Sequence, residues 1–267
     1  MEVIDIRSRE YFNIKTILIS ILIATLLGIN GTQKLVFMSD NIFDLFLITY
    51  GSVQIETIKY VVPVLFWCAP QLYLLLLLGN FIPNKINNFG IYLFTRTTKR
   101  GSWLHKQIFK LFLYNLAYTF TQFITLFIVG IVHGMHFEQS EIVNLSVVFF
   151  TVTFQFFLIL ILSNYISIIL GNLHGIVTVI SINILTLLFS GYLFEFSIKY
   201  IYILKYIPFT QSIITWHDGW IPKSERNELI EFYIPNYHIT FSFFYIVTLV
   251  LILLILFTKK IKKMDIM

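Results

Sequence analysis

The chain of 267 residues is 57% hydrophobic and only 12% of it is Asp, Glu, Lys or Arg; its mean hydropathy is +0.81. A soluble domain carries about 25% charged residues, so this composition excludes a water-soluble globule and predicts an integral membrane protein. The single cysteine, Cys68, excludes an internal disulfide and any CxxC metal or redox motif.

Uncharged runs give the expected number of membrane spans. A helix needs about 20 apolar residues to cross a hydrocarbon core roughly 30 Å thick. Four runs have that length, and a fifth covers the 53 residues 142–194, interrupted by Gly171, Asn172 and Gly175, which predicts a helical hairpin. We expect one all-α transmembrane domain, residues 1–267, with six spans at residues 16–36, 60–82, 109–133, 143–170, 175–194 and 239–258.

The distribution of charge predicts the orientation of these spans. Residues 1–15, 85–110 and 259–267 hold 13 of the 19 Lys and Arg but only 4 of the 14 Asp and Glu. Because basic residues near span ends stay in the cytoplasm, both termini are expected to be cytoplasmic, in the cell membrane of a bacterium. The net charge of +5 thus indicates contact with anionic membrane lipids rather than with nucleic acid.

The first apolar run is expected to be a retained anchor, because no small-x-small cleavage site follows Leu27. Residues 8–15 before it alternate polar and aromatic types, which predicts an amphipathic lead-in at the headgroups. Residues 195–238 form the predicted outer segment before the last helix. Its first part is too apolar for a solvated loop and too charged to cross the membrane, which predicts a re-entrant segment. Residues 223–231 are expected to form a short exposed helix.

A basic segment follows the second span. Its 27 residues, 84–110, contain six basic residues and no acidic one, with aromatic residues between them. One interpretation is a headgroup anchor, in which Lys and Arg reach water while aromatic rings lie at the interface. The other is a short helix that docks on a cytosolic partner, which the length favours because an inner turn needs far fewer residues.

This arrangement resembles the permease subunits of type 2, export-class ABC transporters: six spans with both ends inside, an amphipathic lead-in, a basic inner loop after the second span and a re-entrant outer segment after the fifth. The best local match, LLFSGYLFEFSIKYIYILKYIPFTQSI, is similar to the family's Ser-Gly pair, short outer helix and returning Pro. Here these are Ser190, Gly191 and Pro208. Where the family often has a further Pro, this chain has Glu195 and Phe196.

The resemblance implies partners and a coupling segment. Cytosolic ATPase subunits would bind ATP and Mg, a second permease copy or sister permease would complete the path, and the cargo would be amphipathic or hydrophobic: a peptide, a bacteriocin, a lipid-like molecule or a drug, with immunity as one role. The phosphate-binding motif GxxxxGK[ST] is absent from the sequence, so this chain is expected to hold no cofactor. The implied coupling segment comprises Thr95, Arg96, Thr97, Thr98, Lys99, Arg100, Gly101, Ser102 and Trp103.

Uncharged polar residues recur at helical spacing inside the spans. Asn115, Thr119 and Gln122 share one face of the third span, and Thr151 and Gln155 repeat the spacing in the fourth. They would act either as hydrogen-bonding contacts between helices or as the lining of a substrate path.

Catalytic and metal-binding motifs are weak. His133, His136, Glu138 and Glu141 cluster after the third span, but they lack the HExxH arrangement. We therefore expect no metal site, no catalytic residue and no enzyme. An intramembrane metal-dependent enzyme is the alternative function.

A second alternative is a polytopic transporter outside the ABC class. No ionisable residue lies at mid-span, so the usual carriers of coupled transport are missing. Pro63 and Pro70 are expected to break the second span, and a broken helix can expose backbone groups that bind an ion.

Overall fold

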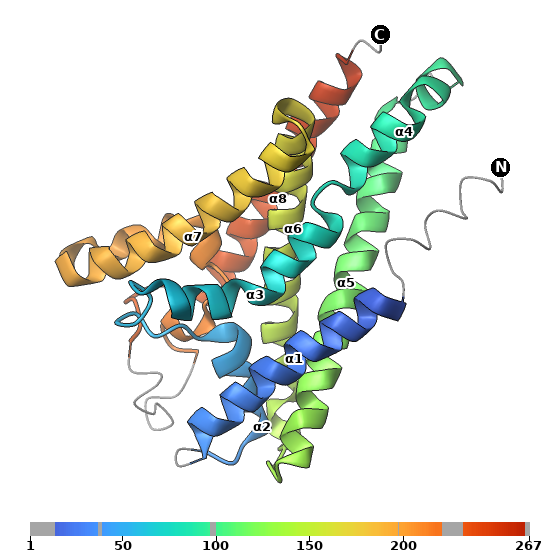
Figure 1. Cartoon of the computed structure of the whole chain (residues 1–267). Helices are drawn as coiled ribbons and strands as arrows, with labels where there is room; N and C mark the ends of the chain where they lie inside the picture. The colour runs from blue at the N-terminus through green and yellow to red at the C-terminus, as the bar shows by residue number, and fades with distance from the viewer. Residues whose placement is uncertain (1–13, 37–38, 97–99, 197, 221–231, 265–267) are drawn as a thin grey trace.

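The computed structural model of the chain describes residues 14–36, 39–96, 100–196, 198–220 and 232–264 (Figure 1). Throughout these ranges regular structure is helical, apart from one isolated β-bridge between Asn41 and His136. The short helices predicted around residues 8–15 and 223–231 lie almost wholly outside the described residues.

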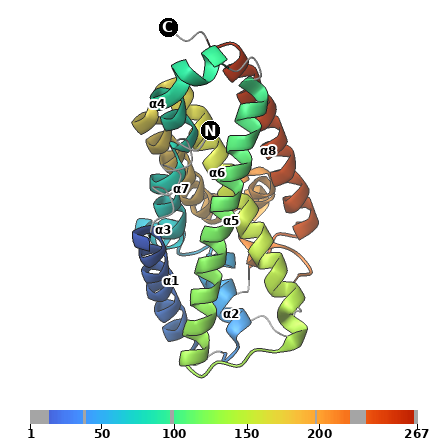
Figure 2. The same cartoon turned by 90° about the vertical axis from the view of Figure 1, so that its right-hand side faces the viewer.

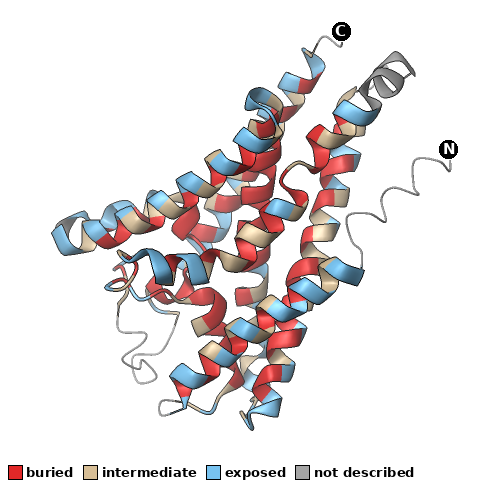
Figure 3. Ribbon diagram, in the orientation of Figure 1, coloured by how far each residue is buried: buried red, intermediate tan, exposed pale blue. Residues whose placement is uncertain are grey.

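Six helices of the described chain are long and apolar enough to cross a membrane, which confirms the all-α, six-span prediction. Their inward faces are buried and their outward faces exposed (Figure 3). The exposed faces carry large apolar side chains, such as Phe120 and Phe244, as expected of helices surrounded by lipid. The helices are α1 Ile14–Leu35, α3 Val61–Leu78 continued by α4 Phe81–Arg96, α5 Arg100–Val132, α6 Ile142–Leu170, α7 Asn172–Phe196 and α8 Ile239–Lys262.

The predicted hairpin between the fourth and fifth spans is confirmed, and its turn is a single residue. Gly171 separates α6 from α7 and has φ of +95°, a conformation that residues with a Cβ rarely adopt. The third span differs from its prediction because α5 begins at Arg100, well before residue 109, and has 33 residues. Its length of about 50 Å exceeds the hydrocarbon core.

The segment between α1 and α3 contains two helical turns that are packed inside the bundle. Helix α2 covers Ile42–Phe46, and a π-helix, η2, covers Leu47–Gly51. Asn41 caps α2 because its side chain accepts a hydrogen bond from the Phe43 N–H. Leu45, Phe46 and Leu47 are fully buried, so this segment belongs to the core.

The outer segment before α8 consists of three 3₁₀ helices rather than one α-helix: η4 Ile198–Tyr206, η5 Pro208–Thr210 and η6 Ile214–Trp216. Residues 209–217 are all buried. The indole N–H of Trp216 donates to the Val53 carbonyl at 3.1 Å, and the ring packs edge-on against Phe232. The two outer segments, 52–58 and 209–217, therefore share one apolar cluster.

The second span is broken, but not where the sequence predicted. Helix α3 continues through Pro63 and Pro70, and the break falls at Gly79 and Asn80, between α3 and α4. Pro63 lies in the first turn of α3, where a missing N–H is tolerated. The prediction of a break at the prolines is therefore wrong.

Two buried side chains of α6 supply hydrogen-bond partners to the backbone at the break. Asn164 of α6 donates to the Leu78 carbonyl at 2.9 Å and accepts from the Ile82 N–H at 2.8 Å. Ser163 donates to the Gly79 carbonyl at 3.2 Å. An unpaired backbone group costs several kcal/mol in lipid, so the break is stable only because α6 supplies these partners.

Replacing Asn164 by Leu is expected to lower the free energy of unfolding by about 2 kcal/mol, because it leaves a buried N–H and a buried carbonyl without partners. The measurement is thermal unfolding of the purified protein in detergent. Asn144→Leu on the same helix is the control, because the Asn144 side chain is only half-buried and has no hydrogen bond within the described part of the chain. Equal losses in the two variants would contradict this account of the break.

Candidate functional site

Helix α4 and the first half of α5 form an antiparallel arm, residues 81–114. The arm projects at the end of the molecule where α8 also ends (Figures 1 and 2). The Lys85 ammonium donates to the Gln107 side-chain oxygen at 2.7 Å, and the rings of Phe81 and Tyr114 meet edge to face at 5.6 Å. These contacts make the arm a braced pair of helices.

The predicted coupling segment lies at the tip of this arm. Thr95 and Arg96 end α4, and Arg100, Gly101, Ser102 and Trp103 begin α5; Thr97, Thr98 and Lys99 lie outside the described residues. The two helices thus leave only residues 97–99 between them. The prediction of a separate short helix is therefore wrong, because the described residues of this segment belong to the end of α4 and the start of α5.

The tip is attached to the end of α8. The Arg100 guanidinium donates to the Met264 carbonyl at 2.6 Å. A Cβ at Gly101 would lie 3.4 Å from the Lys262 side chain and 3.6 Å from Thr258, so the two helices are in close contact. A displacement of the tip would therefore reach α8 directly.

This end of the molecule is strongly basic. Residues 81–96, 100–114 and 239–264 contain no Asp or Glu. A concentration of positive charge attracts anionic partners, either lipid headgroups or an acidic protein surface. The basic residues are Lys85, Arg96, Arg100, Lys106, Lys110, Lys259, Lys260, Lys262 and Lys263.

The polar residues predicted inside the spans are all buried, with exposed fractions of 3% or less. In α5, the amide N–H₂ of Asn115 donates to the Thr153 carbonyl at 2.9 Å, and Thr119 donates to the Asn115 carbonyl at 3.0 Å. Gln122 donates to the backbone and hydroxyl oxygens of Ser20, both at 3.0 Å. These residues connect α5 to α6 and α1.

Gln122 has a further partner that the sequence did not suggest. Tyr50 of η2 donates its hydroxyl to the Gln122 side-chain oxygen at 2.6 Å. Gln122 thereby joins α1, η2 and α5. The sequence provided no reason to pair Tyr50 with Gln122, because the helix η2 that carries Tyr50 was not predicted.

The predicted residues of α6 behave differently. Thr151 and Gln155 are buried, and both amide atoms of Gln155 lack a hydrogen-bond partner among the described residues. The Asn115 side-chain oxygen is also without one there. A buried amide without partners is costly, so Gln155 is poorly explained as a contact between helices.

Methionine substitutions at Gln122 and Gln155 are expected to have different effects on the free energy of unfolding. Gln122→Met should lower the free energy of unfolding by about 2 kcal/mol, because it leaves Tyr50 and Ser20 unpaired in the core. Gln155→Met should leave stability unchanged or raise it, because it removes an unpartnered amide. Thermal unfolding in detergent measures both; a larger loss for Gln155→Met than for Gln122→Met would contradict the assignment.

The Ser-Gly pair near the end of α7 has a packing role. Ser190 donates to the Thr186 carbonyl at 2.8 Å. A Cβ at Gly191 would lie 2.6 Å from Ile58 and 2.7 Å from the Lys59 nitrogen, so only glycine permits this approach of α7 to the chain before α3. Pro208 occupies the first position of η5, which suits a residue without an N–H.

The His and Glu residues after α5 do not converge. His133 Nδ1 lies 2.9 Å from the Val129 carbonyl of its own helix, and the exposed His136 and Asp40 are 3.9 Å apart. Glu141 accepts a short hydrogen bond from the Asn41 amide. No group of three His, Cys, Asp or Glu side chains that could hold a metal ion occurs in the described part of the chain.

A buried histidine that the sequence analysis missed joins the outer segment to α8. His217 is 1% exposed, its Nε2 lies 2.7 Å from the Ser242 hydroxyl and its Nδ1 3.1 Å from the Ile214 carbonyl. Its ring stacks on Tyr237 at 4.1 Å. Burial lowers the pKa of His217 to about 4, so the ring is neutral at pH 7 and its contacts are structural.

This burial predicts a loss of stability in acid. Above pH 6.5 His217 is neutral in both states. Between pH 6.5 and about pH 4, His217 is protonated in the unfolded chain but stays neutral in the folded protein. The free energy of unfolding should therefore fall by about 3 kcal/mol as the pH falls through this range. Thermal unfolding between pH 7 and pH 4 should show a smaller loss of stability for His217→Gln than for the wild-type protein. Equal losses in the two proteins would contradict the prediction.

The spans, the arm and the packed outer segments define a polytopic α-helical membrane protein. The model of one family, described as a protein of unknown function (DUF2705), matches residues 11–267. The chain therefore belongs to the DUF2705 family. No curated protein and no solved structure gives a significant match.

Proposed function

We propose that this chain is the membrane-spanning permease subunit of an ATP-driven ABC exporter. Separate cytosolic ATPase subunits would bind ATP and Mg, and a second permease copy or a sister permease would complete the path. The observation that carries the proposal is the basic arm of α4 and the first half of α5, in which Arg100 at the start of α5 lies against the end of α8. Both termini and the arm's tip are then cytoplasmic, as the excess of basic residues favours.

The length of the arm supports a role outside the bilayer. Helix α5 is about 50 Å long, whereas about 30 Å crosses the hydrocarbon core. An anchor that only placed Lys and Arg at the headgroups would need a turn or two beyond the core. The remaining length can reach a protein at the membrane surface.

The contacts of the arm supply a route for coupling. Closure of the ATPases on ATP would displace residues 95–103, and the braced pair of helices would carry the displacement to the break at Gly79 and Asn80. The contacts of Arg100 and Gly101 with α8 would move the last span as well. Such a rigid-body shift around a break is a common way of switching between two states, here inward-open and outward-open.

The buried polar residues support a closed path in the present conformation. Asn115, Thr119, Gln122, Thr151 and Gln155 are packed between helices, so a state that conducts cargo would have to separate α5 from α6. Gln155 would then gain partners that it lacks here. Spans without ionisable residues at their centres suit an amphipathic or hydrophobic cargo, and export of a membrane-active peptide would give immunity to it.

Charge reversal tests the proposal. Arg96, Lys99 and Arg100 are replaced together by Glu, and the protein is purified with candidate ATPase subunits. We expect the complex to be lost, because like charges oppose docking. Membrane insertion should stay unchanged, and thermal stability should fall only by the loss of the single hydrogen bond from Arg100 to the Met264 carbonyl.

The matched control reverses Lys259, Lys260 and Lys262, which carry the same charge at the same end of the molecule. This variant should retain the complex. Retention of the complex in both variants would favour a lipid anchor and contradict the coupling role.

A further inference from the structure

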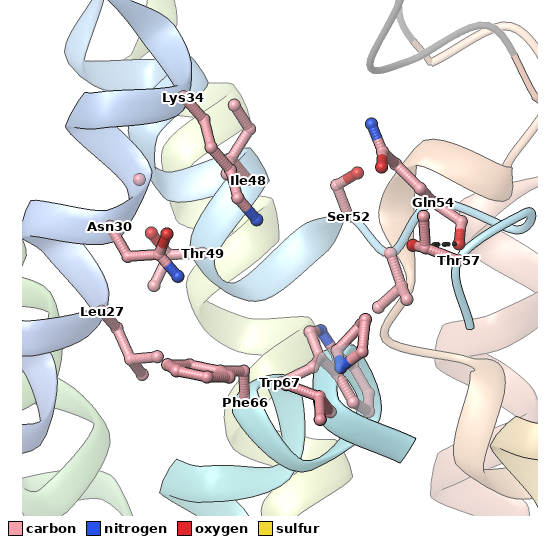
Figure 4. Close-up of a pocket in the computed structure, with 14 residues that line it drawn as sticks. Leu27, Asn30, Lys34, Ile48, Thr49, Ser52, Gln54, Thr57, Phe66 and Trp67 are labelled. Carbon is pink, nitrogen blue, oxygen red and sulfur yellow. Dashed lines mark hydrogen bonds between the residues drawn. The ribbon is translucent and has the colours of Figure 1, made fainter. Parts of the chain in front are cut away.

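A cavity of about 220 Å³ lies between α1, η2 and the first turns of α3. It belongs to none of the features used for the proposed function. In Figure 4 the residues from α1 stand on one side, those after η2 stand opposite, and two aromatic rings lie below. The lining residues that matter here are Asn30 and Lys34, Ser52 and Gln54, and the aromatic Phe66 and Trp67.

The cavity presents hydrogen-bonding groups that the protein does not use. Among the described residues, the side chains of Asn30, Lys34 and Gln54, which line the cavity, have no hydrogen-bond or ion-pair partner. The next lysine along the chain, Lys59, is paired with Glu195. Lys34 therefore places an uncompensated positive charge beside several free donors, a combination suited to an anion.

The size and surroundings of the cavity indicate what kind of anion it takes. Pockets for drug-sized ligands measure about 300–1,000 Å³, so this one has room for a headgroup but little more. Beside it, the surfaces of α1 and α3 expose Leu22, Leu26 and Val62, the last of which also lines the cavity. A ligand with hydrocarbon chains could lay them along these surfaces while its polar end entered the cavity.

We infer that this cavity binds the headgroup of an anionic phospholipid from the outer leaflet. The phosphate lies against the Lys34 ammonium, Asn30 and Gln54 bond the remaining headgroup oxygens, and the first part of an acyl chain packs on Phe66 and Trp67. The inference does not rest on the proposed exporter function.

The test is tryptophan quenching in detergent by phosphatidylglycerol with brominated acyl chains, compared with brominated phosphatidylcholine. We expect saturable quenching by the anionic lipid, and Trp67→Phe should remove most of that saturable component. Lys34→Gln should weaken binding about fivefold, the factor that one lysine contributes at an anionic lipid surface. Lys34 is exposed, so its replacement should leave thermal unfolding unchanged.

Lys59→Gln is the matched control and should retain the wild-type affinity. Equal binding of the two lipids, or equal affinities of the Lys34 and Lys59 variants, would overturn the inference. Glycerol phosphate distinguishes a lipid from a soluble phosphate: it should not displace the brominated lipid at comparable concentration. Displacement would show that the cavity recognises free phosphate and would overturn the lipid assignment.

Discussion

The need to satisfy backbone groups away from water governs this structure. Lipid offers neither donors nor acceptors, so a span can be interrupted only where another helix supplies them. Asn164 meets that condition for the second span by bonding both sides of the break at once. The α3–α4 break and the placement of α6 beside it therefore depend on the Asn164 amide, together with the Ser163 hydroxyl.

The same requirement explains why the outer segments are folded into the bundle. The turn of η2 and the 3₁₀ turns before α8 bring many backbone groups together, and they are paired locally or by neighbouring segments. Trp216 bonds the Val53 carbonyl, and Gln211 bonds the carbonyls of Lys205 and Ile207 at 2.8 Å. The two segments therefore pack together in an apolar cluster separate from the main core.

Sequence reasoning reached the six spans and the hairpin because both follow from long uncharged runs and from Gly171. It missed α2 and η2, since residues 42–51 are too short a run to distinguish a packed turn from a loop. It placed the break at Pro63 and Pro70, although a proline in the first turn of a helix costs little and the decisive partner, Asn164, lies 82 residues away from Ile82. The sequence around His217 contains no motif that marks it, because its side-chain partners Ser242 and Tyr237 lie far from it along the chain, in and just before α8.

The one-residue turn at Gly171 has a mechanical consequence. Helices α6 and α7 are joined too tightly to slide past each other, and α6 also bonds the end of α3 and the start of α4 through Asn164. The hairpin should therefore move as one unit. Helix α8, which a much longer stretch of chain connects to α7, is not constrained in this way.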